Sequence, residues 1–395
     1  MGGILLLLLS FPLFGMEADD FALRGFGTLG AACFSTGKWD FLRDERPDGP
    51  GRSKHCDGKL DSNFGLQFDG AFGESFAVAL QAVAYHRADD SFTPELTLAN
   101  LRWTPSAHTT IRVGRMQNPM FFASEYRNVL YVQPWVRPPA ELYNLATAYS
   151  TDGAIFSASF PLKGWRLNLE VGVGKSQFDV ASSGSLGEVD PVKSNFAYFG
   201  ALLERGHWEL KAGLLGGRVT YTSEAVNLLG IQLAALGLHE LAEDFIFDHK
   251  KATLIGLGVK YETDRWLFQG EYAYRFIDTF NRKQHGAYLL AGRRFGDWMV
   301  YGILAGAWSG TRDLLRHLPP ISPETDATLR ETFAGVENTV NAAVEDQISL
   351  SAGITYPLGT QAILKFQADY VRPRNRPADA PPSGILTTLN LDFIF

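Results

Sequence analysis

The feature that most constrains this chain is a two-residue alternation of apolar and polar side chains that recurs in segments of roughly 10 residues. In the segment 165–171, Trp, Leu and Val occupy one parity, whereas Arg, Asn and Glu occupy the other. The segment 265–276 repeats the pattern, with aromatic residues opposite Gln269, Glu271 and Arg275. Because mid-strand charges require water, the pattern predicts strands with one apolar face and one wet face.

After Asp20 the sequence contains sixteen such segments, which we interpret as antiparallel strands. Their length is that of tilted strands that cross a bilayer. They cover 21–35, 61–72, 75–87, 95–104, 109–117, 152–160, 164–176, 196–205, 207–220, 252–263, 265–276, 285–295, 297–309, 346–358, 360–372 and 384–395.

The connections between these segments alternate between short and long. Turns such as Gly73-Glu74 and Arg205-Gly206 need four residues or fewer. The longer connections are 36–60, 88–94, 118–151, 177–195, 221–251, 277–284, 310–345 and 373–383. A membrane barrel sorts its connections into short periplasmic turns and long extracellular loops, whereas a soluble β protein has no reason to do so. We therefore predict an all-β fold, a transmembrane antiparallel β-barrel of about 16 strands, with a soluble β protein as the alternative.

Composition and charge exclude two other classes. The 395 residues carry 36 basic and 43 acidic side chains, a net charge of −7, which does not favour nucleic acid as a partner. Beyond Gly15 no apolar run approaches the roughly 18 residues of a spanning helix, which excludes a polytopic helical protein.

Five of the eight tryptophans lie within two or three residues of short turns. Amphipathic rings at one level are typical of the aromatic girdle at a membrane interface. The predicted girdle consists of Trp103, Trp165, Trp208, Trp266 and Trp298.

The N-terminal segment and the two cysteines indicate export. Residues 4–14 form an apolar core that predicts a signal peptide over 1–18, although no Lys or Arg precedes it; a single barrel domain then covers 19–395. An exported pair, Cys33 and Cys56, favours one disulfide, and two free thiols are the alternative.

The last strand, Leu389–Phe395, carries apolar residues at alternate positions and ends on an aromatic ring. It resembles the terminal strand of Gram-negative outer-membrane proteins, in which the final Phe is read by the barrel assembly machinery; Phe395 matches it. The segment 121–141 is similar to the third-loop region of proteobacterial porins, and the mature chain resembles the sixteen-stranded trimeric porins. The resemblance implies the outer membrane, contact with membrane lipid and lipopolysaccharide, and a homotrimer, although the second long loop is short for a subunit latch.

A closed barrel of about 16 strands leaves a lumen too wide for side chains to fill, so something must narrow it. The resemblance places the long connection 118–151 inside the lumen. Glu125, Arg127, Arg137 and Glu141 are then expected to project at the constriction; solvated charges on an external loop are the alternative. The wet parity of the strands carries six basic and six acidic wall residues, which leaves ion preference open: Arg24, Arg112, Arg166, Lys211, Arg275 and Lys365, and Asp69, Glu170, Glu209, Glu271, Asp369 and Asp392. Of these, Arg24, Arg112, Arg166 and Lys365 are expected to line the constriction with the loop charges.

Two loops show helical periodicity. In 322–345, Ser322 and Pro323 suit a helix start, and apolar residues recur every three or four positions. The loop 221–251 contains a comparable run, for which we expect packing on the barrel rim ahead of a role over the pore mouth or at a neighbouring subunit.

No motif indicates catalysis. The glycine motif at 25–30 continues as a strand rather than a helix, and the scattered histidines show no metal-ligand spacing. We therefore expect no enzyme activity, no cofactor and no metal site. The function predicted is passive diffusion of small hydrophilic solutes and ions through a porin; a solute-specific channel, a non-conducting adhesin or receptor barrel, and a lipid hydrolase are alternatives.

Overall fold

The computed structural model describes residues 20–44, 46–182, 187–281, 283–310, 314–315, 326–342, 346–374 and 382–395. The predicted signal peptide, 1–18, lies outside these residues. Within them, no helix is long and apolar enough to cross a membrane.

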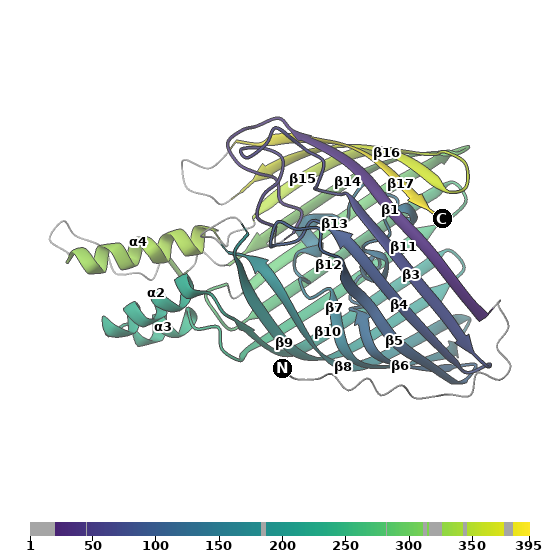
Figure 1. The fold of residues 1–395 in the computed structure, drawn as a ribbon, viewed down its shortest axis with the longest axis horizontal. Coiled ribbons are helices and arrows are strands. Elements are labelled where there is room, and N and C mark those ends of the chain that lie inside the picture. Colours follow the sequence, from purple (N-terminus) through teal and green to yellow (C-terminus); the bar gives the residue numbers. More distant parts are fainter. Residues whose placement is uncertain are drawn as a thin grey trace.

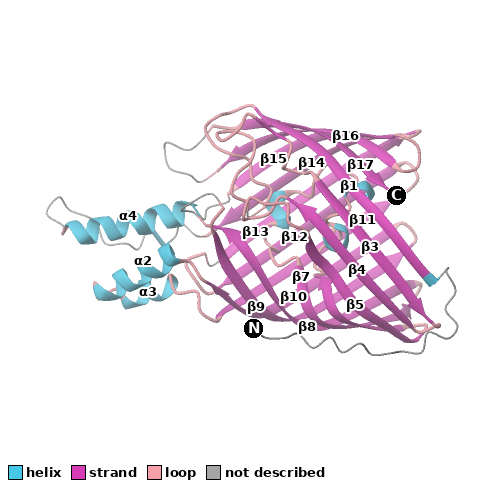
Figure 2. Cartoon of the chain, in the orientation of Figure 1, coloured by secondary structure: helices cyan, strands magenta, loops and turns pink. Residues whose placement is uncertain are grey.

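One antiparallel sheet closes on itself to form the barrel seen in Figures 1 and 2. β1 (Phe21–Phe34) pairs with β3 on one side and with β17 on the other, so the sheet has no open edge. β2 (Cys56–Asp57) adds two residues beside β1. The other spanning strands are β3 (Asn63–Phe72), β4 (Phe76–Tyr85), β5 (Glu95–Ser106), β6 (Thr109–Gln117), β7 (Ser150–Leu162), β8 (Trp165–Ala181), β9 (Val189–Arg205), β10 (Trp208–Tyr221), β11 (Lys250–Glu262), β12 (Trp266–Ile277), β13 (Lys283–Phe295), β14 (Trp298–Ser309), β15 (Gln347–Pro357), β16 (Ala362–Pro373) and β17 (Gly384–Ile394).

The alternation in the sequence explains the strands. Val171 and Val173 of β8 are 53% and 61% exposed on the outer face, and Leu289 of β13 is 66% exposed. Exposed apolar residues of this kind form the lipid-facing surface of a membrane barrel. Left-handed glycines, such as Gly164 and Gly206, permit the short turns. The predicted fold class, a closed antiparallel barrel of about 16 strands, is confirmed.

One long connection is much shorter than predicted. β8 and β9 continue to pair as far as Ala181 and Val189, so the loop expected over 177–195 shrinks to 182–188. The apolar-polar alternation continues through Phe178 and Val180, and this alternation sustains the strand beyond the predicted boundary.

Aromatic residues mark the short-turn end. Four of the five predicted girdle tryptophans are the first residue of a strand, and Trp103 lies near the end of β5, stacked on Phe76. Phe395 exchanges backbone hydrogen bonds with Gly25 of β1, and its ring stacks on Phe64. The terminal residue therefore lies at the seam of the barrel.

Three helices project together from the long-loop end (Figure 1). α2 (Glu224–Ala235), α3 (His239–Asp244) and α4 (Ala327–Ala342) share one apolar cluster. Ser322 and Pro323, the predicted helix start, lie outside the described residues; Asp326 accepts the backbone N–H of Thr328 at the observed start of α4. The helices thus pack mainly on one another beyond the barrel strands.

Candidate functional site

The connection between β6 and β7 (118–149), here called loop 3, lies inside the barrel as predicted. It contains two short 3-10 turns, η2 (Ser124–Tyr126) and η3 (Leu130–Val132), and α1 (Ala140–Tyr143). At its start, Lys211 Nζ donates to the carbonyl of Phe121 at 2.8 Å, and the backbone N–H of Phe122 donates to Glu271 at 2.8 Å. These contacts fasten the beginning of loop 3 to β10 and β12.

Lys365 of β16 fastens the middle of loop 3. Its Nζ lies 2.8 Å from Asp392 and donates to the carbonyls of Leu130 and Gln133 at 2.6 and 2.8 Å. The side chain is 0% exposed. The expectation that Lys365 lines the constriction is therefore wrong: buried carbonyls need donors, and this ammonium supplies them.

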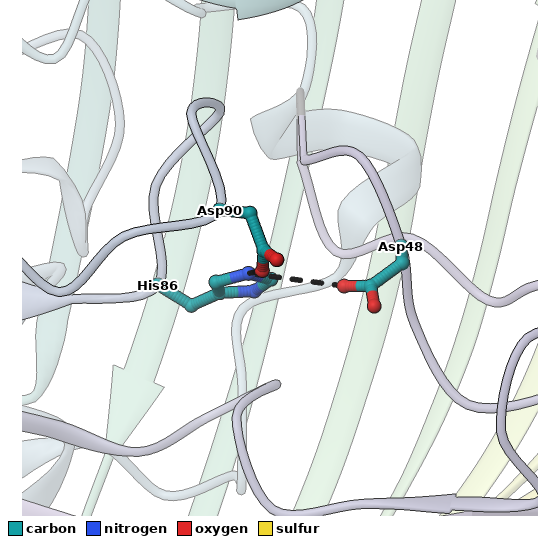
Figure 3. Close-up of side chains that lie close together, drawn as sticks. All are labelled: Asp48, His86 and Asp90. Atoms are coloured by element: carbon teal, nitrogen blue, oxygen red, sulfur yellow. Dashed lines mark hydrogen bonds and ion pairs between the residues drawn. The ribbon is translucent and has the colours of Figure 1, made fainter. Parts of the chain in front are cut away.

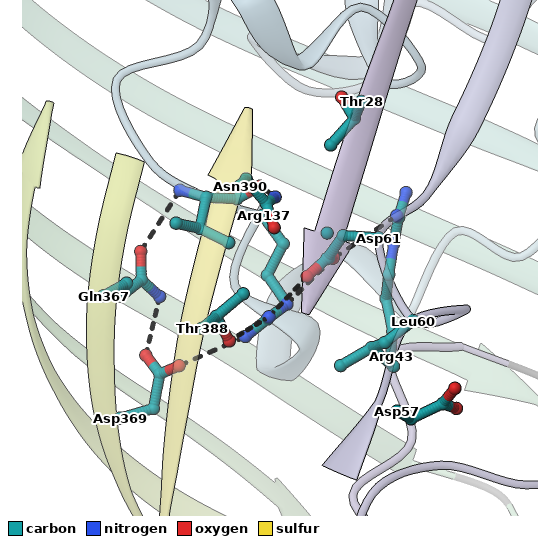
Figure 4. A network of polar contacts seen from close by, with 12 residues as sticks. Thr28, Arg43, Asp57, Leu60, Asp61, Arg137, Gln367, Asp369, Thr388 and Asn390 are labelled. Carbon is teal, nitrogen blue, oxygen red and sulfur yellow. Dashed lines mark hydrogen bonds and ion pairs between the residues drawn. The ribbon is translucent and has the colours of Figure 1, made fainter. Parts of the chain in front are cut away.

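Arg137 fastens the next part of the loop through the network in Figure 4. Its guanidinium forms two hydrogen bonds with Asp61, of 3.0 and 2.5 Å, and one of 3.1 Å with Asp369. Thr388 Oγ1 accepts a fourth at 2.6 Å. Burial alone would lower the pKa of Arg137, but the charge of Asp61 and the hydrogen bond to it raise the pKa. The predicted projection of Arg137 into pore water is wrong, because the side chain is 4% exposed and paired with two carboxylates.

Glu141 of α1 is also buried rather than projecting. Gln347 Nε2 donates to its carboxylate at 2.8 Å. Burial raises the pKa of Glu141, and this effect outweighs the hydrogen bonds from Ser349 and Gln347, which lower the pKa. Its position corrects the prediction: α1 packs against β13 and β14, so its acidic side chain points into a packed wall.

One side of the lumen is a dry core. Met120, Phe121, Trp135 and Leu142 of loop 3 pack in one cluster with lumenal residues of β11–β14. The wall residues of that cluster are Tyr198 of β9 and, from β11–β14, Leu254, Leu267, Ala273, Tyr288, Leu290, Met299, Tyr301, Ile303 and Ala305. On this side the prediction that inward-facing strand residues contact water is wrong, because loop 3 packs on them in place of water.

The other side of the lumen keeps exposed charges. Arg112 of β6 lies 2.9 Å from Glu125 of loop 3 and 3.3 Å from Glu170 of β8. Glu125 is 37% exposed, and Arg166 on the same strand as Glu170 is exposed. Opposed charges here join loop 3 to the wall, and all three side chains stay partly exposed.

Arg24 lies apart from these charges. It pairs with Asp69 at 2.8 Å, and its side chain is 66% exposed near the short-turn end of β1. Arg24 therefore lines the wall beyond loop 3 rather than facing it.

Arg127 lines a cavity of about 930 Å³ at the long-loop end, together with Arg43, Arg46 and Tyr149. Its guanidinium lies 3.6 Å from the centre of the Tyr149 ring and donates to the Tyr149 hydroxyl. Burial and repulsion by Arg46 lower the pKa of Arg43 to about 10. This cavity, here called the vestibule, gathers three arginines around Asp44.

Sequence reasoning missed Arg43, Arg46 and Asp61, which lie in the connection between β1 and β3 (35–62), here called loop 1. Loop 1 folds inward, and the structure joins its Cys56 to Cys33 of β1 by a disulfide. The density of Arg and Asp residues between 43 and 61 is a sequence signal, but Arg137, the partner of Asp61, lies 76 residues further along the chain.

No protein-family model matches the sequence, and no curated protein matches it. Solved structures do match. OmpF of Salmonella typhi, in a complex with daunomycin, has a TM-score of 0.56 at 10% identity, with 96% of this chain and 99% of that chain covered. The outer-membrane channel DcaP of Acinetobacter baumannii gives 0.55 at 10% identity over 96% and 99% of the two chains. An anion-selective porin of Comamonas acidovorans gives 0.52 at 11% identity, over 95% and 99%. The chain therefore has the fold of the outer-membrane porins.

Proposed function

We propose that the chain is a passive channel for small hydrophilic solutes and ions in the outer membrane of a Gram-negative bacterium. The observation that carries this proposal is the contact of Arg112 with Glu125 and Glu170, whose side chains stay 22%, 37% and 24% exposed. Buried ion pairs would hold loop 3 equally well, so exposure here serves a wet path beside the loop. Neither cofactor nor catalysis has a role in this proposal.

Several further parts of the proposal rest on the porin fold and on the sequence. Residues 1–18 direct export, and Phe395 is read by the barrel assembly machinery. The five tryptophans contact membrane lipid at the periplasmic interface, and the long-loop end of the barrel contacts lipopolysaccharide. Assembly into a homotrimer completes the proposal.

Planar-bilayer recording of the purified protein tests conduction and its site together. Arg112→Glu is expected to favour cations and Glu125→Lys to favour anions, each changing the permeability ratio about fivefold after screening by salt. Glu240→Lys, an exposed residue of α3, is the control for net charge. A protein that inserts without conducting contradicts the proposal and favours an adhesin or receptor barrel.

A channel specific for small anions is the second candidate. The vestibule favours it, because Arg43, Arg46 and Arg127 face one cavity with Asp44. The anion-selective porin of Comamonas acidovorans shares the fold. For this candidate, we expect a small dicarboxylate to reduce the chloride current of the wild type but not that of Arg127→Gln. A general channel shows no such reduction in either protein.

A further inference from the structure

Three side chains with metal-binding atoms converge between loop 1 and the connection of β4 to β5 (86–94), here called loop 2 (Figure 3). Asp48 comes from loop 1, and His86 and Asp90 come from loop 2. One ligand atom from each lies within 4.8 Å of the others. His86 Nε2 is 2.7 Å from Asp90 Oδ1 and 3.7 Å from Asp48 Oδ1.

The surroundings hold these groups in place. The His86 side chain is 0% exposed, and its ring stacks on Phe92. Asp90 has a positive φ of 56°, and its backbone N–H donates to the carbonyl of Arg87, which closes a tight turn. Lys54 Nζ fixes the second oxygen of Asp48 at 2.9 Å. The geometry is thus set by packing and hydrogen bonds before any ligand binds.

Two buried atoms of the cluster, Asp48 Oδ1 and His86 Nδ1, have no hydrogen-bond partner among the described residues. Asp48 is 6% exposed, and its Oδ1 accepts no hydrogen bond from the described residues. A buried carboxylate oxygen without a donor is costly, and such atoms are rare in folded proteins. The Asp48 oxygen faces His86 Nε2, so a cation between the two loops would satisfy it.

We propose that Asp48, His86 and Asp90 bind one divalent first-row transition metal ion of the Zn²⁺ type, which ties loop 1 to loop 2. An imidazole nitrogen with two carboxylate oxygens suits Zn²⁺ better than Mg²⁺ or Ca²⁺, which prefer oxygen ligands alone. Tetrahedral bonds to zinc place neighbouring ligand atoms about 3.4 Å apart. The observed 2.7 and 3.7 Å bracket that spacing.

Lys59 is the competitor that the ion must displace. Its Nζ lies 2.6 Å from the same Asp90 oxygen, and its side chain is 33% exposed, so the ammonium can turn into water. The charges of Asp48 and Asp90 are balanced by those of Lys54 and Lys59, so the cluster has no net charge when His86 is uncharged. The ion therefore adds positive charge at the vestibule, which His86 lines.

The inference is tested by zinc binding, which does not depend on conduction. Untagged protein, free of lipopolysaccharide, is titrated with Zn²⁺ by calorimetry and dialysed against Zn²⁺ for elemental analysis. We expect one equivalent in the wild type. Asp48→Asn and His86→Gln are expected to bind about 100-fold more weakly, because each removes a direct ligand.

His249→Ala is the matched control. His249 also lies beside an aspartate, Asp248, at 2.6 Å, but both side chains are 69% exposed and no third ligand group joins them among the described residues. Visible absorption of bound Co²⁺, lost in Asp48→Asn, reports on the same ligands independently. Heat-modifiable gel mobility shows whether each variant is folded. If His86→Gln does not fold, the zinc affinity of the nearly isosteric Asp48→Asn decides the test. A wild type without bound zinc, or Asp48→Asn with wild-type affinity, overturns the inference.

Discussion

The two sides of the lumen differ in what they contain, although one sheet builds both. The lumenal faces of β11–β17, here called the dry side, are covered by loop 3, with Trp135 and Leu142 fully buried. The lumenal faces of β5–β8, here called the wet side, keep Arg112 and Glu170 partly exposed. Each side also meets loop 3 differently, through buried anchors on one and exposed ion pairs on the other.

This difference teaches that the polarity of a lumenal face depends on the segment it meets. Alternation along a strand decides which side chains point inward, but loop 3 decides whether they meet water. Where the loop packs closely, the inward positions hold Tyr288 and Ile303, as in a protein core. The proposed water path is therefore asymmetric within the barrel.

Removing the central anchor of the dry side is expected to have the largest effect. Arg137→Met leaves Asp61 and Asp369 buried without their shared partner, which is expected to cost about 3–5 kcal/mol in the free energy of unfolding. Loop 3 then loses its Arg137 anchor on β16 and β17 but keeps the Lys365 anchor, so single-channel current becomes noisier. Urea unfolding in detergent and bilayer recording measure the two effects.

Arg166→Met is the control for that experiment. Its side chain is exposed on the wet side, so its removal is expected to change stability by less than about 0.5 kcal/mol. If the two variants unfold alike, loop 3 is not anchored by the buried network, and the distinction between the two sides fails.

Truncating an apolar residue of loop 3 sharpens the comparison. Leu142 is 0% exposed within the dry core, so Leu142→Ala is expected to cost about 3 kcal/mol. Val132, in the same loop, is 57% exposed, and Val132→Ala is expected to leave stability nearly unchanged. Equal effects in thermal unfolding would mean that the loop does not pack as a core.

Local patterns predicted the barrel, but only part of the site. Alternation in 165–171 depends on neighbouring residues alone, and so do the short turns, so both were read correctly. Apolar residues at both parities of 297–309 indicate burial on two faces, and loop 3 covers the inner face of that strand. The pairing of Arg137 with Asp61 depends on the path of two loops, which no local pattern determines.

Because Asp61 is ionised and buried on the dry side, we expect the stability of the folded protein to fall in acid. Burial opposes ionisation, but the charge of Arg137 and the hydrogen bond to it lower the pKa of Asp61 below its usual value. The folded state thus binds this proton less tightly than the unfolded chain does. The stabilisation is present above the unfolded pKa of about 3.9 and is lost as the pH falls through the lower folded pKa.

We therefore expect the urea midpoint of the wild type to fall below about pH 4. Asp61→Asn is expected to be less stable at pH 7, because Arg137 loses a charged partner, and to show a shallower decline in acid. Identical pH profiles for the two proteins would show that Asp61 does not supply this stabilisation.

Glu141 is expected to behave in the opposite way, with the smallest effect. Burial raises its pKa, so the folded state binds this proton more tightly, and the associated stabilisation is lost as the pH rises through the folded pKa. Near pH 8 the ionised carboxylate is a cost, which Glu141→Gln removes without changing the shape of the side chain. Denaturant titration of Glu141→Gln at pH 8 is expected to show stability equal to the wild type or slightly above it, by less than about 1 kcal/mol. A large loss there, comparable with that of Arg137→Met, would mean that Glu141 is held as an anion, and that the dry side depends on paired charges throughout rather than on packing around α1.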